Sequence, residues 1–206
     1  MKYIMILILL LTISCGEESK ETEKIILSDP DTSSLVLAWP ESEFPLRLIV
    51  PSSLEASFST AYNNAANKWN DALGFTAFEI VFEGNNIIFG TSSQYLNDDI
   101  FSVAFPPDWI DVETSVLALT SFSFFNGTLL HADIIFNILT FTFDTSPNNS
   151  EIDFETVLIH EMGHFLGLKH VASDIDSLSV MQPSLRFGQR RRNLSAGDIQ
   201  RIQELY

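Results

Sequence analysis

Residues 160–170 read HEMGHFLGLKH, and this stretch decides the fold. His160 and His164 are four residues apart, so on a helix their side chains emerge from one face, about one turn apart. That spacing suits two imidazole ligands on one tetrahedral zinc ion. Gly167 tolerates the left-handed conformation that ends a helix, so the chain can turn back and deliver His170 as a third ligand.

A metal held by three protein ligands keeps one coordination position open, which distinguishes a catalytic zinc from a structural one. Glu161 follows the first ligand directly, and its carboxylate can reach a zinc-activated water. These residues predict metal-assisted hydrolysis with Glu161 as the general base. The alternative is a helix whose histidines are ordinary core or surface residues. Three of the chain's four histidines at ligand spacing argue against it.

The pattern HExxHxxGxxH resembles the signature of the metzincin zinc endopeptidases. Met181, eleven residues after His170, resembles the methionine turn that this family places beneath its metal. Residues 132–137 (ADIIFN) are similar to the strand along the cleft of the matrixin-like branch, and residues 194–199 (LSAGDI) are similar to its C-terminal helix. The resemblance covers most of residues 40–206.

This resemblance implies an endopeptidase that hydrolyses peptide bonds of proteins, with one catalytic Zn²⁺ held by the three histidines. Met181 is expected to pack beneath the ligands. Ala132, Asp133 and Ile134 are candidates for the strand that pairs with an extended substrate by edge addition, and the alternative is an ordinary paired strand. His131, the fourth histidine, is expected to be a hydrogen-bonded surface or core residue rather than a second metal ligand.

The fold class predicted for the chain is α+β. A metzincin-like zinc protease domain implies a twisted mixed β-sheet with an active-site helix and a C-terminal helix. Asn126-Gly127 predicts a hairpin turn, and residues 91–115 predict a long loop. Strands are expected at residues 46–50, 75–82, 86–89, 116–125 and 131–143, and helices at residues 57–73, 152–166 and 195–206.

An apolar run, residues 3–13 (YIMILILLLTI), follows Lys2. In a helix it would span about 16 Å, roughly half of a bilayer core, so it predicts the hydrophobic region of an export signal. The segment from Thr12 to Gly16 resembles the lipobox of bacterial lipoproteins, in which the cysteine, here Cys15, is lipidated and becomes the mature N-terminus. The alternative is an ordinary secretory peptide.

Three segments are expected on this basis. Residues 1–14 are a lipoprotein-type signal peptide, residues 15–35 a flexible acidic tether, and residues 36–206 the metzincin-like zinc metallopeptidase domain. The protein is expected to be exported to the bacterial cell envelope and anchored to a membrane through Cys15, with secretion as the alternative. Its net charge of -16 repels nucleic acid, and a monomer with a protein or peptide substrate is expected.

Two other functions stay open on the sequence. One is a catalytically weak zinc-binding surface lipoprotein that acts in adhesion or binding, and the presence of Glu161 argues against it. The other is a structural module that zinc only stabilises. Calcium is a second candidate ion, but no loop matches a calcium-binding pattern. The run Arg190–Arg192 is expected to be a solvated face rather than a site for an acidic partner.

Overall fold

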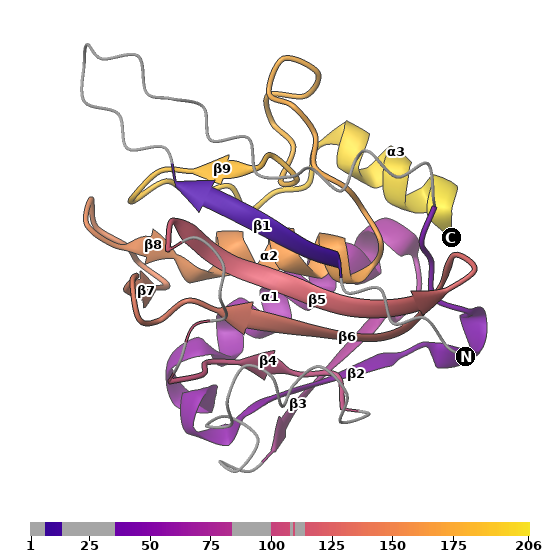
Figure 1. Cartoon of the computed structure of the whole chain (residues 1–206), viewed down its shortest axis with the longest axis horizontal. Coiled ribbons are helices and arrows are strands. Elements are labelled where there is room, and N and C mark those ends of the chain that lie inside the picture. The colour runs from indigo at the N-terminus through magenta and orange to yellow at the C-terminus, as the bar shows by residue number, and fades with distance from the viewer. Residues whose placement is uncertain (1–6, 14–35, 84–99, 108, 110–113) are drawn as a thin grey trace.

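The structure is a computed structural model that describes residues 7–13, 36–83, 100–107, 109 and 114–206 (Figure 1). Its helices are α1 (Glu55–Leu73), α2 (Phe154–Phe165) and α3 (Ala196–Leu205), with 3₁₀ turns η2 (Glu41–Glu43) and η3 (Ser52–Leu54). Its strands are β1 (Leu7–Ile13), β2 (Leu46–Pro51), β3 (Phe78–Glu83), β4 (Val103–Ala104), β5 (Val116–Phe125), β6 (Thr128–Phe136), β7 (Phe143–Asp144), β8 (Ile152–Asp153) and β9 (Ser184–Leu185).

Parallel and antiparallel strands combine in one layer, which confirms the predicted α+β class with a mixed sheet. β2 and β3 run parallel, and α1 is the crossover between them. An isolated bridge between Ile49 of β2 and Ser102 links this pair to a sheet of order β4-β6-β5-β1-β9. In that sheet β4 is parallel to β6, whereas β5 is antiparallel to both β6 and β1.

The hairpin between β5 and β6 forms at the predicted turn. Asn126 has φ 50° and Gly127 has φ 84°, and a two-residue turn of this kind needs positive φ at both positions. β6 ends earlier than the strand expected at residues 131–143. The reason is that the side chain of Asn137 accepts a hydrogen bond from the amide of Thr140 at 3.1 Å, which turns the chain away from the sheet.

Two expectations concern residues 84–115, a loop at residues 91–115 and a strand at residues 86–89. The predicted loop at residues 91–115 contains β4, which pairs with Ile134 and Ile135 of β6. A strand of two residues is too short to produce a periodic hydrophobic pattern, so the sequence could not reveal it. The strand expected at residues 86–89 lies outside the described residues.

An aromatic core fills the space between the sheet and the helices α1 and α2, which lie behind the sheet in Figure 1. Phe154, the first residue of α2, stacks on Phe136 of β6 with ring centroids 4.9 Å apart. The same ring meets Tyr62 of α1 edge to face at 5.2 Å. These contacts fix the start of α2 against both of its neighbours.

Two tryptophan side chains hold the later part of α2. Trp69 of α1 donates from Nε1 to the carbonyl of Ile159 at 3.0 Å, and Trp39 donates to the carbonyl of Phe165 at 2.7 Å. All twelve residues of α2 are buried as a result. A helix without a solvent face can carry buried polar side chains only where each of them has a partner.

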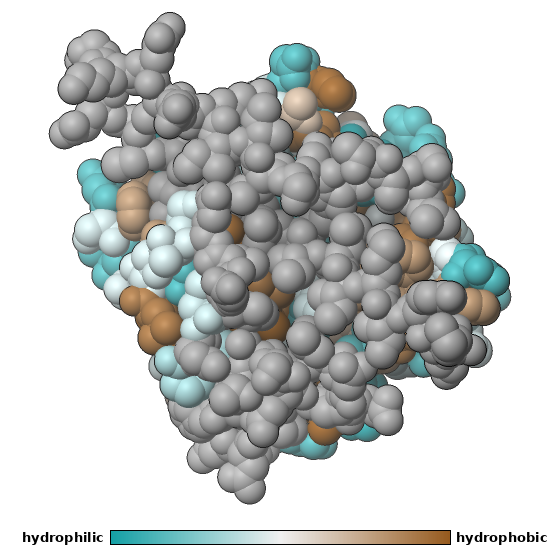
Figure 2. Space-filling view, in the orientation of Figure 1, coloured by the Kyte–Doolittle hydropathy of each residue, from teal (hydrophilic) through white to brown (hydrophobic). Residues whose placement is uncertain are grey.

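The visible surface mixes polar and apolar residues, in contrast to the aromatic core. Where described residues are visible in Figure 2, hydrophilic and hydrophobic ones lie side by side. None of the described helices combines the length and the apolar composition that crossing a membrane requires.

In the whole chain, the apolar run near the N-terminus pairs with the sheet. β1 hydrogen-bonds to β5 in antiparallel fashion and to β9 in parallel fashion. Strand pairing uses backbone groups that every residue has, so an apolar run typical of a signal can also add to an open sheet edge. The signal peptide and the tether stay predictions, because residues 1–6 and 14–35, with Cys15, lie outside the described residues.

A buried aspartate connects α3 to the segment before Met181. Ser195 is the N-cap of α3, as the sequence indicated, and forms a capping box with Asp198. The Asp198 carboxylate also accepts hydrogen bonds from the Ser179 hydroxyl at 2.6 Å and the Val180 amide at 2.9 Å. One carboxylate therefore fixes both the start of the last helix and the chain beneath α2.

We expect Asp198→Asn to lower the free energy of unfolding by about 2 kcal/mol, since an amide nitrogen would face donors that now bind a carboxylate oxygen. Urea unfolding measures this change. Glu204→Gln, at an exposed position of the same helix, is the matched control and should change stability by less than about 0.5 kcal/mol. Equal stability of the two variants would contradict the assigned role of Asp198.

Candidate metal centre

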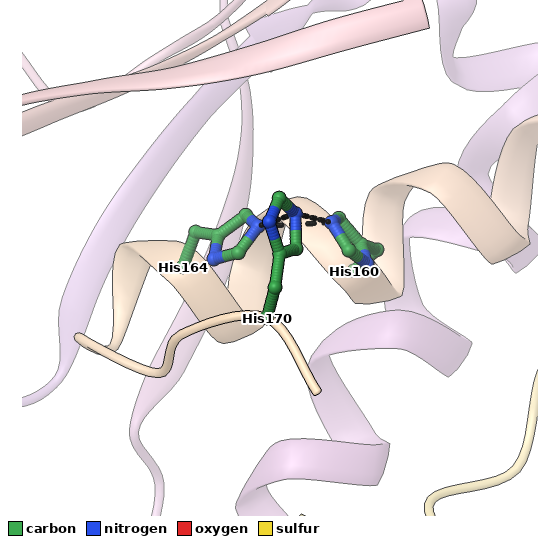
Figure 3. A group of neighbouring side chains, drawn as sticks. All are labelled: His160, His164 and His170. Atoms are coloured by element: carbon green, nitrogen blue, oxygen red, sulfur yellow. Dashed lines mark hydrogen bonds between the residues drawn. The ribbon is translucent and has the colours of Figure 1, made fainter. Parts of the chain in front are cut away.

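Three imidazole rings meet above the end of α2 (Figure 3). His160 and His164 project from the helix, and His170 reaches them from the segment that follows it. The Nε2 atom of His164 lies 2.9 Å from that of His160 and 3.2 Å from that of His170, and the third distance is 3.3 Å. Nitrogens bound about 2.0 Å from a tetrahedral zinc stand roughly 3.3 Å apart. The spacing of the rings therefore fits one ion.

The remaining nitrogens of two rings settle the protonation of this cluster. His160 Nδ1 lies 2.7 Å from the carbonyl of Val180, and His164 Nδ1 lies 2.8 Å from that of Leu168. A carbonyl only accepts, so each Nδ1 carries the proton and each Nε2 presents a bare lone pair. Burial lowers the pKa of both histidines well below the ordinary value, which keeps the rings neutral. Neutral imidazoles whose lone pairs converge are ligands of the kind that zinc binds.

The end of α2 is shaped by Gly167, which has φ 95°. Its amide donates to the carbonyl of His164 at 2.8 Å, and the amide of Leu168 donates to the carbonyl of Gly163 at 2.9 Å. A Cβ at Gly167 would collide with the carbonyl oxygen of Leu37. Glycine is therefore required here both by the positive φ and by the lack of room for a Cβ. The turn that it allows brings the chain back to the three histidines.

Met181 lies buried against the underside of α2. A Cβ added at Gly163 would collide with the Met181 sulfur, and Trp69 would be the next contact. Val180, the residue before Met181, supplies the carbonyl that His160 binds. The methionine segment thus packs beneath the helix and orients one of the rings, and within the described residues these three histidines form the one cluster suited to a metal ion.

Glu161 is completely buried beside this cluster. Thr120 of β5 donates from its hydroxyl to Glu161 Oε2 at 2.7 Å, whereas Glu161 Oε1 has no hydrogen-bond partner in the described part of the chain. Burial raises the pKa of Glu161 to about 8, and the hydrogen bond from Thr120 opposes that rise. The sequence offered no motif that could have identified Thr120.

The candidate substrate strand lies inside the sheet. Ala132, Asp133 and Ile134 lie in β6, which is paired with β5 on one side and with β4 on the other. Ile134 alone faces Thr120 on β5 and Val103 on β4. At Ile134, β6 therefore has a paired strand on both edges. This pairing favours the alternative, an ordinary paired strand.

His131 is a hydrogen-bonded core residue, as expected. Its Nε2 lies 2.7 Å from Asp133 Oδ2, while the hydroxyl of Ser102 donates to Asp133 Oδ1 at 2.7 Å. Asp133 is fully buried and His131 almost so. These residues tie β6 to the segment before β4 and stand apart from the histidine cluster.

In the arginine run Arg190 is exposed, as expected, whereas Arg191 and Arg192 are partly buried. Arg192 donates from Nε to Asp153 Oδ2 at 2.8 Å, and its Nη1 lies 3.2 Å from Glu155 Oε2. The backbone amide of Arg191 donates to the hydroxyl of Thr156 at 2.8 Å. The run is thus partly buried against the first turn of α2, where Asp153 is the N-cap. This pairing neutralises carboxylates that the helix terminus itself needs.

We expect His170→Ala to weaken zinc binding by about 100-fold or more, since losing even an outer partner of a ligand costs up to that factor. Metal analysis after dialysis against a competing chelator measures it. His131→Ala removes a histidine outside the cluster and should retain zinc. Unchanged zinc content in the His170 variant would exclude this residue as a ligand.

Comparison with known proteins identifies a related family. The sequence model of the matrixin peptidases matches residues 51–206. Metalloendoproteinase 1 of Glycine max is 43% identical over 61 residues, which are 30% of this chain and 19% of that protein. Matrilysin of Felis catus is 52% identical over 58 residues, 27% of this chain and 20% of the relative. Metalloendoproteinase 4-MMP of Arabidopsis thaliana is 29% identical over 125 residues, 49% and 35% of the two chains. The chain therefore spans between 19% and 35% of these relatives' lengths.

Proposed function

Because the chain belongs to the matrixin family of metallopeptidases, we propose that it is a zinc-dependent endopeptidase that hydrolyses peptide bonds of proteins. One observation carries the proposal: the lone pairs of three imidazoles converge next to a buried carboxylate, one oxygen of which has no hydrogen-bond partner among the described residues. A structural zinc site is normally closed by a fourth side chain. Within the described residues the cluster contains three donors and no fourth.

His160, His164 and His170 would hold the zinc ion, which supplies Lewis-acid chemistry for a scissile carbonyl and an attacking water. Glu161 takes the proton of that water as the carbonyl carbon is attacked, and then delivers it to the leaving amine. Its position suits this task because a carboxylate in a dry environment binds a proton more readily than one in water. Val180 and Leu168 keep the rings oriented through their carbonyls.

The substrate, on this proposal, adds to β5 rather than to β6. What supports this is β1, an extended segment of the chain itself that runs antiparallel to β5 and parallel to β9. Leu9 of β1 faces Thr120, the residue that binds Glu161. A peptide in that place would pass directly beside the catalytic carboxylate. Backbone pairing of this kind accepts many sequences, as a protease of proteins requires.

We expect Glu161→Gln to reduce peptide cleavage by about 10²- to 10⁴-fold, the usual contribution of a general base, while zinc content stays at the wild-type level. The side chain keeps its shape but no longer accepts a proton. Cleavage of a peptide library, analysed by mass spectrometry, measures the activity. Glu83→Gln, at an exposed position of β3, is the control and should behave as wild type.

Other outcomes would identify the competing functions. A zinc-loaded wild-type protein that cleaves nothing in the library would favour the surface lipoprotein that acts in adhesion or binding. Unfolding on zinc removal, without any cleavage by the loaded protein, would favour the structural module. Wild-type activity in the Glu161 variant would exclude Glu161 as the base.

We further propose that the protein is exported and anchored in the bacterial envelope through a lipid on Cys15. The support is in the sequence, where the apolar run of residues 3–13 is followed by Ser14 and then by this single cysteine. Processing before Cys15 would remove the whole of β1. The edge of β5 beside Glu161 would then be available to a substrate.

We expect protein that begins at Cys15 to cleave peptides with a kcat/KM about tenfold or more above that of the whole chain. A tethered strand competes with substrate at an effective concentration on the order of millimolar. Replacing Leu9 and Leu10 together by proline in the whole chain should raise activity in the same direction, because proline removes amide donors. Equal activity of all three proteins would show that β1 and substrate do not share the edge of β5.

A further inference from the structure

We propose that Thr120 is a positioning residue that fixes the orientation of the Glu161 carboxylate for catalysis. This inference rests on the proposed peptidase function. It concerns a residue of the sheet, far from the zinc motif in sequence, and it assigns Thr120 no contact with the reacting atoms.

The contact joins two buried side chains from different layers. Thr120 lies on β5 and Glu161 on α2, and both side chains are completely shielded from solvent. The hydroxyl oxygen of Thr120 is 2.7 Å from Glu161 Oε2 and 3.0 Å from the backbone oxygen of Glu161. A hydroxyl has one proton to donate, and the carboxylate oxygen is the nearer of the two acceptors. The carboxylate is therefore the partner that the geometry favours.

The two carboxylate oxygens have different surroundings. Oε2 is held by Thr120, and Oε1 is buried with no hydrogen-bond partner among the described residues. An anchored Oε2 restricts rotation of the carboxylate plane and leaves Oε1 to exchange protons with the reaction. Without the anchor, a buried carboxylate would turn towards any other donor that it could reach, since leaving it unpaired costs free energy.

The strand gives this anchor a fixed position. Thr120 faces Ile134 on β6, so the strand register fixes its position in the sheet. A β-branched side chain has few χ1 rotamers, which restricts the hydroxyl further. On its other side Thr120 faces Leu9 of β1, in the place we propose for the substrate. Thr120 would thus align both the substrate backbone and Glu161. A single residue of β5 then sets the distance between the substrate and the base.

The test compares Thr120→Val, which keeps the shape and removes the hydroxyl, with Thr120→Ser, which keeps the hydroxyl. Thr128→Val, an exposed threonine of β6, is the control. All variants are expressed as the full chain, so that any processing at the N-terminus is the same. Steady-state kinetics on a single fluorogenic peptide, zinc content and thermal unfolding are measured for each.

We expect kcat of Thr120→Val to fall about tenfold or more, the factor that corresponds to one hydrogen bond to a charged group, with KM and zinc content unchanged. Thr120→Ser should restore most of kcat. A Thr120→Val protein with wild-type kcat would overturn the inference, as would a loss of kcat that Thr120→Ser shares in full. If Thr120→Val does not fold, Thr120→Ala takes its place in the comparison with serine.

This result is separable from a failure of the proposed function. An inactive wild-type protein would overturn the peptidase itself. An active wild type that depends on Glu161 but not on the Thr120 hydroxyl would overturn the positioning role alone.

Discussion

Two bare imidazole nitrogens, on His160 and His164, stand 2.9 Å apart inside the protein. The two lone pairs converge, because the proton of each ring is on Nδ1, which donates a hydrogen bond to a backbone carbonyl. Such an arrangement is unfavourable without a cation, and water cannot screen it in a buried site. The rest of the fold has to hold α2 and its neighbours rigidly enough to keep the imidazole nitrogens together. A bound metal ion would offset the repulsion between their lone pairs.

Contacts from several distant segments of the chain hold α2 in place. Trp39 and Trp69 bind two of its carbonyls, and Met181 fills the space against Gly163. The C-terminal helix takes part through Val180, whose amide binds Asp198 and whose carbonyl binds His160. Two hydrogen bonds thus separate the last helix from a metal-binding ring. A change at the C-terminus can therefore reach the metal centre without touching it.

The sheet contributes through β5, whose two edges have different partners. One edge pairs with β6 from Ala118 to Phe125, and the other pairs with β1. Thr120 stands at the point where this strand meets Glu161 of the helix layer. On the proposed function, substrate alignment and orientation of the base would then depend on one strand.

Features encoded by neighbouring residues were predictable. The spacing of the three histidines, the reversal at Gly167, the turn at Asn126-Gly127 and the cap at Ser195 each depend on residues within about ten positions of each other. Local geometry alone decides them, since a helix turn or a positive φ favours particular residue types. The same reasoning gave the α+β class and the positions of the long helices.

Features that depend on distant pairing were not predictable. The sequence could not show that β6 lies between two strands, that Arg192 returns to the first turn of α2, or that Thr120 meets Glu161. Strand pairing uses backbone groups common to all residues, and a threonine in an apolar strand looks the same whatever faces it. The sequence by itself predicted the metal ligands and the base. Only the tertiary structure decided which sheet edge lies beside them and which side chain holds the base, because both depend on contacts between segments far apart in the chain.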